Sequence, residues 1–362
     1  MAMRTLIRFI SALAVAASLA GAAQAQNYRV LGRSEPVANG GFAIQWPGSG
    51  FEVTLTGSKL TAQIEDWGSN WLNVEVDGKV TPLALKEGSW EYILFDGAPG
   101  RHTIKVTRRT GTPVGVTRFL DISADGPMLP TEDRSRRIMV IGDSVTSGYG
   151  IEGESQFCAY SHATQNHDLA YPALTAAAFN ADIHTIAADG RGLIRNFSGN
   201  DPTMAEAAWR ELPGSQVNWA RLAYRPNVIV INLGSADFAA GDPGDGFDAA
   251  YVDMLATLRQ TYPQAEIYGA IGGMLHGDAY AAARNSVLGA VNTRRDAGDP
   301  KVHFIEFSLE SSPRRFGCDW HPGLDAHRQM ALKLEAAITR DLGWKPSRKP
   351  AAPAEEGLLS AR

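Results

Sequence analysis

Hydrophobic and polar residues alternate with a period of two along the first third of the chain. Apolar residues take every second position in several short runs, and turn-forming pairs such as Asp77-Gly78 and Pro99-Gly100 separate these runs. A period of two is typical of strands with one buried face. The pattern predicts an antiparallel, jelly-roll-like β-sandwich over residues 27–128, with strands at 42–46, 51–55, 60–64, 72–76 and 102–106.

The pattern changes after a polar, proline-marked connection that begins at residue 126. Beyond it, short β-branched runs alternate with longer segments that have a helical period. Strands that alternate with helices form parallel sheets covered on both faces. The sequence predicts an α/β domain with a five-stranded parallel sheet over residues 136–344. Its strands are expected at 138–141, 183–187, 228–233, 267–271 and 302–307, and its helices at 170–179, 248–261, 279–297 and 325–342.

The two ends of the chain differ from both domains. Residues 1–25 contain two arginines, an apolar stretch and the small-x-small sequence Ala23-Gln24-Ala25, which is typical of a signal peptide cut after about Ala25. We therefore expect a secreted or periplasmic protein. Residues 345–362 are rich in Pro, Ala, Lys and Glu, which predicts a disordered tail. No later segment reads as a membrane span, so we expect no membrane partner.

Composition narrows the partners and raises the question of a disulfide. The chain of 362 residues has a formal net charge of −5 and no basic stripe, so nucleic acid is not an expected partner. Its two cysteines, Cys158 and Cys318, could pair in an oxidising compartment or remain two buried thiols. No His/Cys cluster has the spacing of a zinc site. Nothing in the sequence sets the oligomeric state.

The candidate chemistry follows the predicted strands of the second domain. The first strand ends in Gly142-Asp143-Ser144, as expected for a buried strand that delivers a serine to the edge of a sheet, with Asp143 as a turn residue that braces it. Gly190 follows the second strand, residues 234–237 follow the third, and His321 follows the fifth. A serine nucleophile needs a base to take its proton and donors for the oxyanion. These motifs would meet at one edge, which predicts a serine hydrolase.

Taken together, four motifs resemble the SGNH, or GDSL-like, hydrolase superfamily over about residues 136–342. They are Gly-Asp-Ser-Val-Thr-Ser-Gly-Tyr-Gly, Gly-Arg-Gly, Asn-Leu-Gly-x-x-Asp-Phe and Cys-Asp-Trp-His-Pro. With a jelly-roll domain in front, the chain is similar to carbohydrate esterase family 2. Members of that family remove acetyl groups from plant polysaccharides such as xylan and glucomannan.

The resemblance implies a role for each matching residue. Ser144 matches the nucleophile, which would form an acetyl-enzyme and whose N–H would donate to the oxyanion. Gly190 matches the second oxyanion donor, and His321 matches the general base. Asp319 is the candidate that orients His321, although some family members use a backbone carbonyl instead. The resemblance implies no metal and no cofactor.

Three further residues are candidates for binding an acetylated polysaccharide or oligosaccharide. Trp320, next to the base, could stack on a sugar ring or could anchor the His321 loop by packing. Tyr149 and Arg195 could line the cleft that holds the sugar.

The chain departs from the superfamily pattern at two positions: the side-chain donor to the oxyanion and the acid that orients the histidine. The third motif in the family carries an asparagine whose amide completes the oxyanion hole, and Ala236 stands there in this chain. Ser235 is the nearest candidate to replace that donor. The last motif in the superfamily places the acid three residues before the histidine, where this chain has Cys318.

These observations leave three functions open. The first is an exported serine esterase that removes O-acetyl groups from plant polysaccharides, as an acetyl xylan or glucomannan esterase. The second is an SGNH esterase on other acetyl or short-acyl esters. The third is a non-catalytic carbohydrate-binding relative with a degenerate oxyanion hole, which Ala236 would favour.

Overall fold

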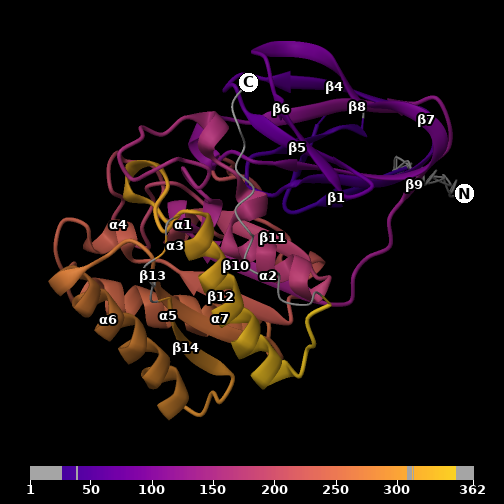
Figure 1. Ribbon diagram of the computed structural model, residues 1–362. Helices are drawn as coiled ribbons and strands as arrows, with labels where there is room; N and C mark the ends of the chain where they lie inside the picture. Colours follow the sequence, from indigo (N-terminus) through magenta and orange to yellow (C-terminus); the bar gives the residue numbers. More distant parts are fainter. Residues whose placement is uncertain (1–26, 38–39, 308–311, 313, 348–362) are drawn as a thin grey trace, which may run out of the picture.

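Two β-sheets organise the molecule, an antiparallel one in the N-terminal part and a parallel one in the rest (Figure 1). The structure is a computed structural model that describes residues 27–37, 40–307, 312 and 314–347. The predicted signal peptide and residues 348–362 of the predicted tail lie outside these residues. The remaining part of that tail is described, and the backbone N–H of Ser347 donates to the carbonyl of Ala178 at 2.6 Å. The described helices include none whose length and hydropathy would suit a membrane span.

The antiparallel sheet is built around two long paired strands, β4 (Gly50–Asp66) and β7 (Gly88–Arg108). The first half of β4 also pairs with β1 and β9, and its second half pairs with β8. The pairing register of β4 shifts between Gly57 and Lys59, where one half passes into the other. The shorter strands are β1 (Arg29–Leu31), β2 (Glu35–Pro36), β3 (Phe42–Ile44), β5 (Trp71–Val76), β6 (Lys79–Ala84), β8 (Thr117–Ala124) and β9 (Met128–Pro130).

The expected strands at 51–55 and 60–64 are therefore the two halves of a single strand. Gly57 and Ser58 interrupt the apolar alternation, and a bulge inside a strand gives the same sequence pattern as a turn between strands. Apolar side chains from both halves, such as Phe51 and Ile64, meet in one core with Leu72 of β5. The antiparallel architecture predicted for this part of the chain is confirmed.

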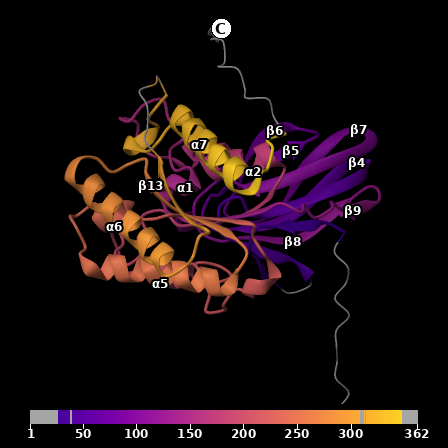
Figure 2. The ribbon, with the colours of Figure 1, turned by 90° about the horizontal axis from the view of Figure 1, so that it is seen from below.

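Within the described residues, the strands of the parallel sheet are arranged in the order β11-β10-β12-β13-β14. Its strands are β10 (Arg137–Gly142), β11 (Asp182–Ala187), β12 (Val228–Asn232), β13 (Glu266–Gly272) and β14 (Val302–Phe307). Helices α5 and α6 cover one face, and α2 and α7 cover the other (Figure 2). Along β10, Met139 packs toward the first pair of helices and Val140 toward the second. The predicted five-stranded α/β domain is confirmed.

The long helices agree with the predicted ranges, and the short ones had no prediction. A helix of four residues makes barely one turn, so it shows no period in the sequence. The helices are α1 (Ser144–Ser147), α2 (Tyr171–Phe179), α3 (Met204–Ala207), α4 (Ser235–Phe238), α5 (Asp245–Thr261), α6 (Gly277–Asp296) and α7 (Leu324–Leu342), with 3-10 turns at Thr112–Val114, His162–Thr164, His167–Leu169, Arg221–Ala223 and Cys318–Trp320.

Buried contacts join the antiparallel domain to the parallel one. The Arg29 guanidinium binds Glu52 at 2.6 Å within its own domain and Asp182 at 2.7 Å at the start of β11. The side chain of Trp46 is fully buried in the core of the parallel domain, and its indole N–H donates to the Glu211 carbonyl at 2.8 Å. The two domains therefore share a common interior.

Candidate active site

The candidate nucleophile Ser144 lies at the first position of α1, directly after β10. The Asp143 carboxylate accepts the N–H of Val145 at 3.0 Å and so caps this short helix. A Cβ on Gly142 would lie 2.1 Å from the Thr146 hydroxyl oxygen, so only glycine lets the chain turn this sharply. The sharp turn presents Ser144 at the carboxyl edge of the sheet, and Asp143 braces it as predicted.

His321 completes a serine–histidine pair. Its Nε2 lies 2.9 Å from the Ser144 Oγ, and its Nδ1 lies 3.1 Å from the backbone carbonyl oxygen of Asp319. A carbonyl can only accept a hydrogen bond, so Nδ1 carries the proton and Nε2 is free to accept the serine proton. Burial lowers the pKa of His321 to about 4, although the Asp319 carbonyl and carboxylate oppose this shift. The imidazole is therefore neutral and ready to act as a base at neutral pH.

The carboxylate of Asp319 does not orient the histidine, so that prediction is wrong. It accepts hydrogen bonds from the Tyr149 hydroxyl at 3.2 Å and the Tyr160 backbone N–H at 3.1 Å. The main chain of Asp319 orients His321 instead. With only one residue between them, a backbone carbonyl reaches the imidazole more readily than the side chain does.

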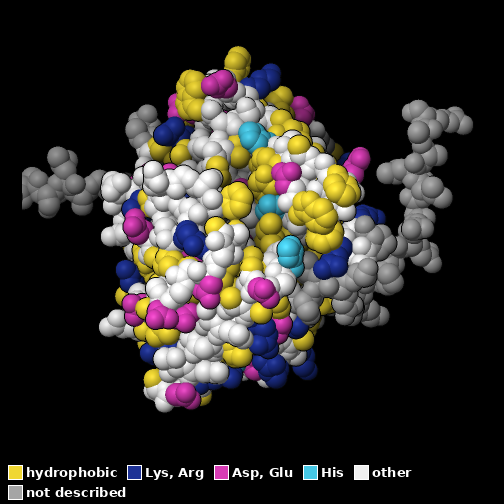
Figure 3. All heavy atoms as spheres, turned by 90° about the vertical axis from the view of Figure 1, so that its left-hand side faces the viewer, with side chains coloured by type: hydrophobic (Ala, Val, Ile, Leu, Met, Phe, Trp, Pro, Cys, Tyr) yellow, Lys and Arg dark blue, Asp and Glu magenta, His cyan; other side chains and the backbone are white. Residues whose placement is uncertain are grey.

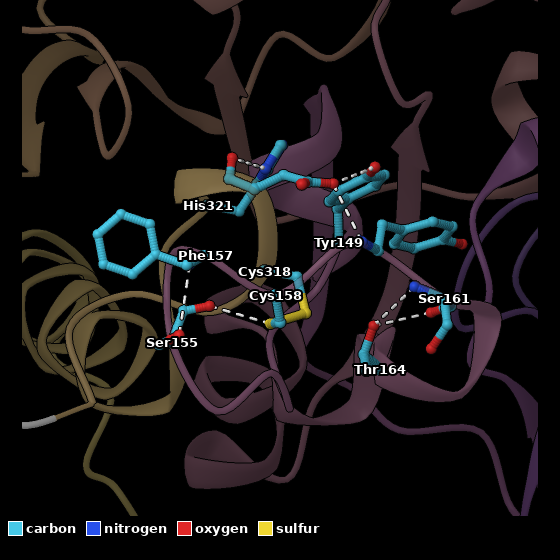
Figure 4. The surroundings of a disulfide bond; sticks show 10 residues. Tyr149, Ser155, Phe157, Cys158, Ser161, Thr164, Cys318 and His321 are labelled. Carbon is cyan, nitrogen blue, oxygen red and sulfur yellow. Dashed lines mark hydrogen bonds between the residues drawn. A yellow bond between two sulfur atoms is a disulfide. The ribbon is translucent and has the colours of Figure 1, made fainter.

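A disulfide bond holds this segment of main chain. Cys158 and Cys318 are bonded, which confirms that the two cysteines pair (Figure 4). The N–H of Asp319 also donates to the Cys158 carbonyl at 3.0 Å. Asp319 and Trp320 both have positive φ, 51° and 62°, a conformation that costs about 1 kcal/mol or more for a residue with a Cβ. The cross-link therefore holds a turn that the local sequence does not favour.

Tyr149 belongs to the support of the histidine. Its ring stacks on Tyr160 with centroids 4.0 Å apart, and its centroid lies 4.2 Å from that of His321 (Figure 4). Its hydroxyl is directed to Asp319. The structure thus places this predicted sugar contact behind the candidate base His321.

Gly190, the predicted oxyanion donor, lies in the loop after β11. The register of the sheet pairs Ala187 with Gly142, and the N–H of Ala188 donates to the Gly142 carbonyl at 3.2 Å. These contacts bring the loop beside the strand that carries Ser144. Gly190 has φ +72°, and apart from its chain neighbours no described atom lies within 4 Å of the place a Cβ would take. The space next to this glycine is open, as an acyl group would require.

Asp237 holds the far end of the same loop, a role that the sequence interpretation missed. Its buried carboxylate accepts the backbone N–H groups of Leu193, Ile194 and Arg195 at 2.8, 2.8 and 2.9 Å. Burial raises the pKa of Asp237, and these N–H groups act in the opposite direction. The available signal was an acid a few residues after an apolar strand, where a buried carboxylate needs several donors.

Ala236 and Ser235 occupy α4, beside Asp237. Ala236 is buried and offers only a methyl group where the resemblance led us to expect an amide. The Ser235 hydroxyl lies within hydrogen-bonding reach of the Asp143 carboxylate. Burial raises the pKa of Asp143 to about 7, while the Val145 N–H and Ser235 lower it. The structure therefore directs the predicted replacement donor toward the turn behind the nucleophile.

Arg195 braces two loops. Its guanidinium donates to the backbone carbonyls of Asp237 and Gly241. This side chain therefore joins the loop after β11 to the loop after α4, and the contacts seen for it are with the protein's own main chain.

Trp320 remains available at the surface. Its side chain is 53% exposed and meets Phe157 and Phe316 edge-on, with centroids 5.6 and 5.5 Å away. Trp320, Phe316, Phe307, Met274 and Gly273 help to line a cavity of about 660 Å³. On the face of the molecule in Figure 3, histidine side chains lie among hydrophobic ones. An exposed indole beside the base suits a sugar ring.

The cavity begins next to the Ser144–His321 pair. A Cβ on its wall residue Gly273 would lie 3.3 Å from a methyl group of Val145 and 3.4 Å from the Pro322 ring. These residues directly follow Ser144 and His321. Across the described residues, no three His, Cys, Asp or Glu side chains are grouped so that they could hold a metal ion.

Family models match both parts of the chain. The model described as carbohydrate esterase 2 N-terminal matches residues 30–131, and the GDSL-like lipase/acylhydrolase family model matches residues 140–329.

Individual relatives agree with these matches. The cellulase/esterase CelE of Acetivibrio thermocellus is 34% identical over 83% of this chain, which spans 38% of the length of that protein. An acetylxylan esterase/glucomannan deacetylase of Cellvibrio japonicus is 28% identical over 89% of this chain and 91% of its own. A solved family two carbohydrate esterase from Clostridium thermocellum, in complex with cellohexaose, has a TM-score of 0.84 and 33% identity. That match covers 88% of this chain and 99% of the solved one.

Proposed function

The chain belongs to carbohydrate esterase family 2 within the GDSL-like hydrolases, and from this premise we propose that it removes O-acetyl groups from plant polysaccharides such as xylan or glucomannan. The observation that carries the proposal is the 2.9 Å contact between the Ser144 hydroxyl and the neutral Nε2 of His321. This contact gives the serine its base without any rearrangement.

The first half of the reaction transfers the acetyl group to the protein. His321 Nε2 accepts the Ser144 proton while Oγ bonds to the acetyl carbonyl carbon. The N–H groups of Ser144 and Gly190 would hold the resulting oxyanion. The imidazolium then gives its proton to the sugar oxygen as the bond between that oxygen and the carbonyl carbon breaks. The products are a free sugar hydroxyl and acetyl-Ser144.

The second half releases acetate. Water gives a proton to His321 Nε2 while its oxygen attacks the acetyl carbon. The collapse of the second intermediate returns the proton to Ser144. Throughout, the Asp319 carbonyl holds the Nδ1 proton, so the ring keeps its orientation in both steps.

Two features of the site support a glycan as the group that leaves. Trp320 and Phe157 are exposed beside the base, where the sugar oxygen would stand. The cavity along Trp320 extends the site on the same side. The solved relative in complex with cellohexaose also supports a glycan as the substrate.

We propose that the protein works outside the cytoplasm, in the periplasm or the medium. Residues 1–25 have the pattern of a signal peptide, and the Cys158–Cys318 bond suits an oxidising compartment. Determining the N-terminal sequence of the protein recovered from each cell fraction tests this. Recovery of the protein from the cytoplasm alone, with Met1 intact, would refute it.

Acetate release from acetylated xylan, acetylated glucomannan and an aryl acetate tests the catalytic proposal. The wild type should release acetate and Ser144→Ala should not. Longer acyl esters of the same aryl alcohol should react more slowly; equal rates would favour an esterase that does not discriminate by acyl length. Binding of an oligosaccharide without any acetate release would identify a non-catalytic relative instead.

The variant Ala236→Asn tests whether the site works with two oxyanion donors. Loss of one side-chain donor from a serine hydrolase costs about 3–4 kcal/mol of transition-state stabilisation. Ala236→Asn should therefore raise kcat. An unchanged or lower kcat would mean that another group already fills that position.

A further inference from the structure

A loop of the antiparallel domain reaches the interior of the candidate active site. β7 ends at Arg108, and the residues that follow it are buried through Thr112. The backbone N–H of Gly111 donates to Gln165 Oε1 at 2.9 Å, and the Tyr160 hydroxyl donates to the same oxygen at 2.7 Å. This amide oxygen therefore faces two donors, which fixes the orientation of the Gln165 side chain.

The other end of the Gln165 amide contacts the catalytic loops. Its Nε2 donates to the Ser147 hydroxyl at 3.0 Å and to Asp189 Oδ2 at 3.2 Å. The Ser147 hydroxyl in turn donates to Asp189 Oδ1. Ser147 is on α1, three residues after the nucleophile, and Asp189 directly precedes Gly190. Gln165 thus connects the antiparallel domain to both sides of the oxyanion site.

Gly111 touches this connection directly. A Cβ at this position would lie 2.0 Å from Asp189 Oδ2 and 2.8 Å from Gln165 Nε2. Its φ is −74°, which any residue adopts, so close contact with the carboxylate is the reason for a glycine here. Burial raises the pKa of Asp189, and its hydrogen bonds with Ser147 and Gln165 and the charge of the fully buried Arg108 act in the opposite direction.

We propose that the loop at residues 108–112 positions the oxyanion donor Gly190. Gln165 and Asp189 are the positioning residues that transmit this contact. The antiparallel domain would then be a necessary part of the esterase site in addition to any contact it makes with glycan. The inference rests on the proposed function, because an oxyanion forms only if the chain is an esterase.

The variant Gly111→Ala is the direct test, because it changes a residue outside the parallel domain. The added methyl group would displace Asp189 and with it Gly190. A displacement of about 1 Å can cost about a hundredfold in rate. We expect kcat for 4-nitrophenyl acetate to fall about tenfold or more, with KM within about twofold of the wild type.

The matched control is Gly57→Ala. A Cβ on Gly57 would lie 2.3 Å from the Asp125 carboxylate, so the same crowding occurs elsewhere in the antiparallel domain. This variant should keep its kcat within about twofold. Equal kcat values for the two folded variants would overturn the proposal.

A reciprocal exchange separates positioning from simple loss of structure. In Asp189→Asn, the new amide group faces the Gln165 amide donor, and kcat should fall. Adding Gln165→Glu places a carboxylate acceptor opposite the new amide donor at position 189, so the hydrogen bond re-forms in the opposite direction. The double variant should recover most of the lost kcat. Failure of the double variant to exceed Asp189→Asn, with both folded, would contradict the assigned role.

Hydrogen exchange provides a readout that does not depend on activity. Gly111→Ala should speed amide exchange in residues 188–197, and Gly57→Ala should leave it unchanged. If the wild type hydrolyses no aryl acetate, the proposed function fails. The exchange rates still decide whether the 108–112 loop holds this segment, and unchanged exchange would refute that.

Discussion

The two sides of the serine are held by different physical means. On the base side, a disulfide bond and stacked rings fix an exposed turn that carries His321. On the oxyanion side, buried carboxylates accept main-chain N–H groups, as Asp237 does for Leu193, Ile194 and Arg195. A surface turn can exchange its hydrogen bonds with water, so a covalent bond is the more effective restraint there. In the interior, an N–H group that loses its acceptor costs free energy because water cannot replace the lost hydrogen bond. A buried carboxylate therefore holds the main chain without a covalent bond.

The largest expected effect comes from removing the base itself. His321→Ala should lower kcat for 4-nitrophenyl acetate by about 10⁴-fold or more, because it removes the nitrogen that contacts the Ser144 hydroxyl and would take its proton. The control His327→Ala, which also removes a buried imidazole, should have a far smaller effect on kcat, provided that the variant folds. Steady-state kinetics of both variants check this. Substantial activity in His321→Ala would mean that His321 is not the base.

The oxyanion side should be the next most sensitive. In Asp237→Asn, an amide group would face the Leu193 N–H in place of an acceptor oxygen. We expect kcat to fall about tenfold to a hundredfold and the free energy of unfolding to fall by about 2 kcal/mol.

The control for that variant is Asp125→Asn. Asp125 also accepts main-chain N–H groups, from Ser58 and Lys59, but on the antiparallel domain. Urea unfolding and kcat should both be measured. A normal kcat in a destabilised Asp237→Asn would show that the carboxylate stabilises the fold without affecting the chemistry.

Removing the disulfide should affect stability more than chemistry. The bond closes a loop of 160 residues, for which the chain-entropy model gives about 5 kcal/mol. Cys158→Ser with Cys318→Ser should lower the free energy of unfolding by about 2–5 kcal/mol and kcat by about tenfold or less. Reduction of the wild type should give the same result, and the reductant should not change the double variant further. Unaltered stability would contradict the assigned restraint.

Asp319→Asn should have the smallest effect. Its carboxylate contacts Tyr149 and Tyr160, and its backbone carbonyl, which the substitution keeps, holds His321. We expect kcat to change by less than about threefold, compared with about 10⁴-fold where a carboxylate orients the base.

The pH profile sharpens this prediction. The base must be neutral, so activity should be lost as the pH falls through the His321 pKa of about 4. The Asp319 charge raises that pKa, so Asp319→Asn should move the acidic limb to lower pH. A shift to higher pH would contradict the arrangement.

Much of the fold could be predicted because its signals are local. The strands and long helices of the parallel domain follow runs of apolar residues, and the edge where Ser144, Gly190 and His321 meet follows from the carboxyl ends of parallel strands. Two predicted strands proved to be one, β4, because both halves pair with β7. That pairing joins residues far apart in the sequence, so the local pattern could not predict it.

The missed parts of the site depend on distant contacts. The roles of Asp237 and Gln165 follow from groups far away in the sequence, at residues 193–195 and at Gly111. The error at Asp319 has a different origin. The residue was correctly located, but the sequence does not show whether its side chain or its carbonyl faces the histidine.

The neutral state of His321 has a consequence for a reaction whose product is an acid. Each proposed turnover releases acetic acid, so dense acetylated substrate would acidify its own surroundings. A base that stays unprotonated down to about pH 4 keeps working while its product accumulates. Burial of this imidazole would thus free the enzyme from feedback by its own acid.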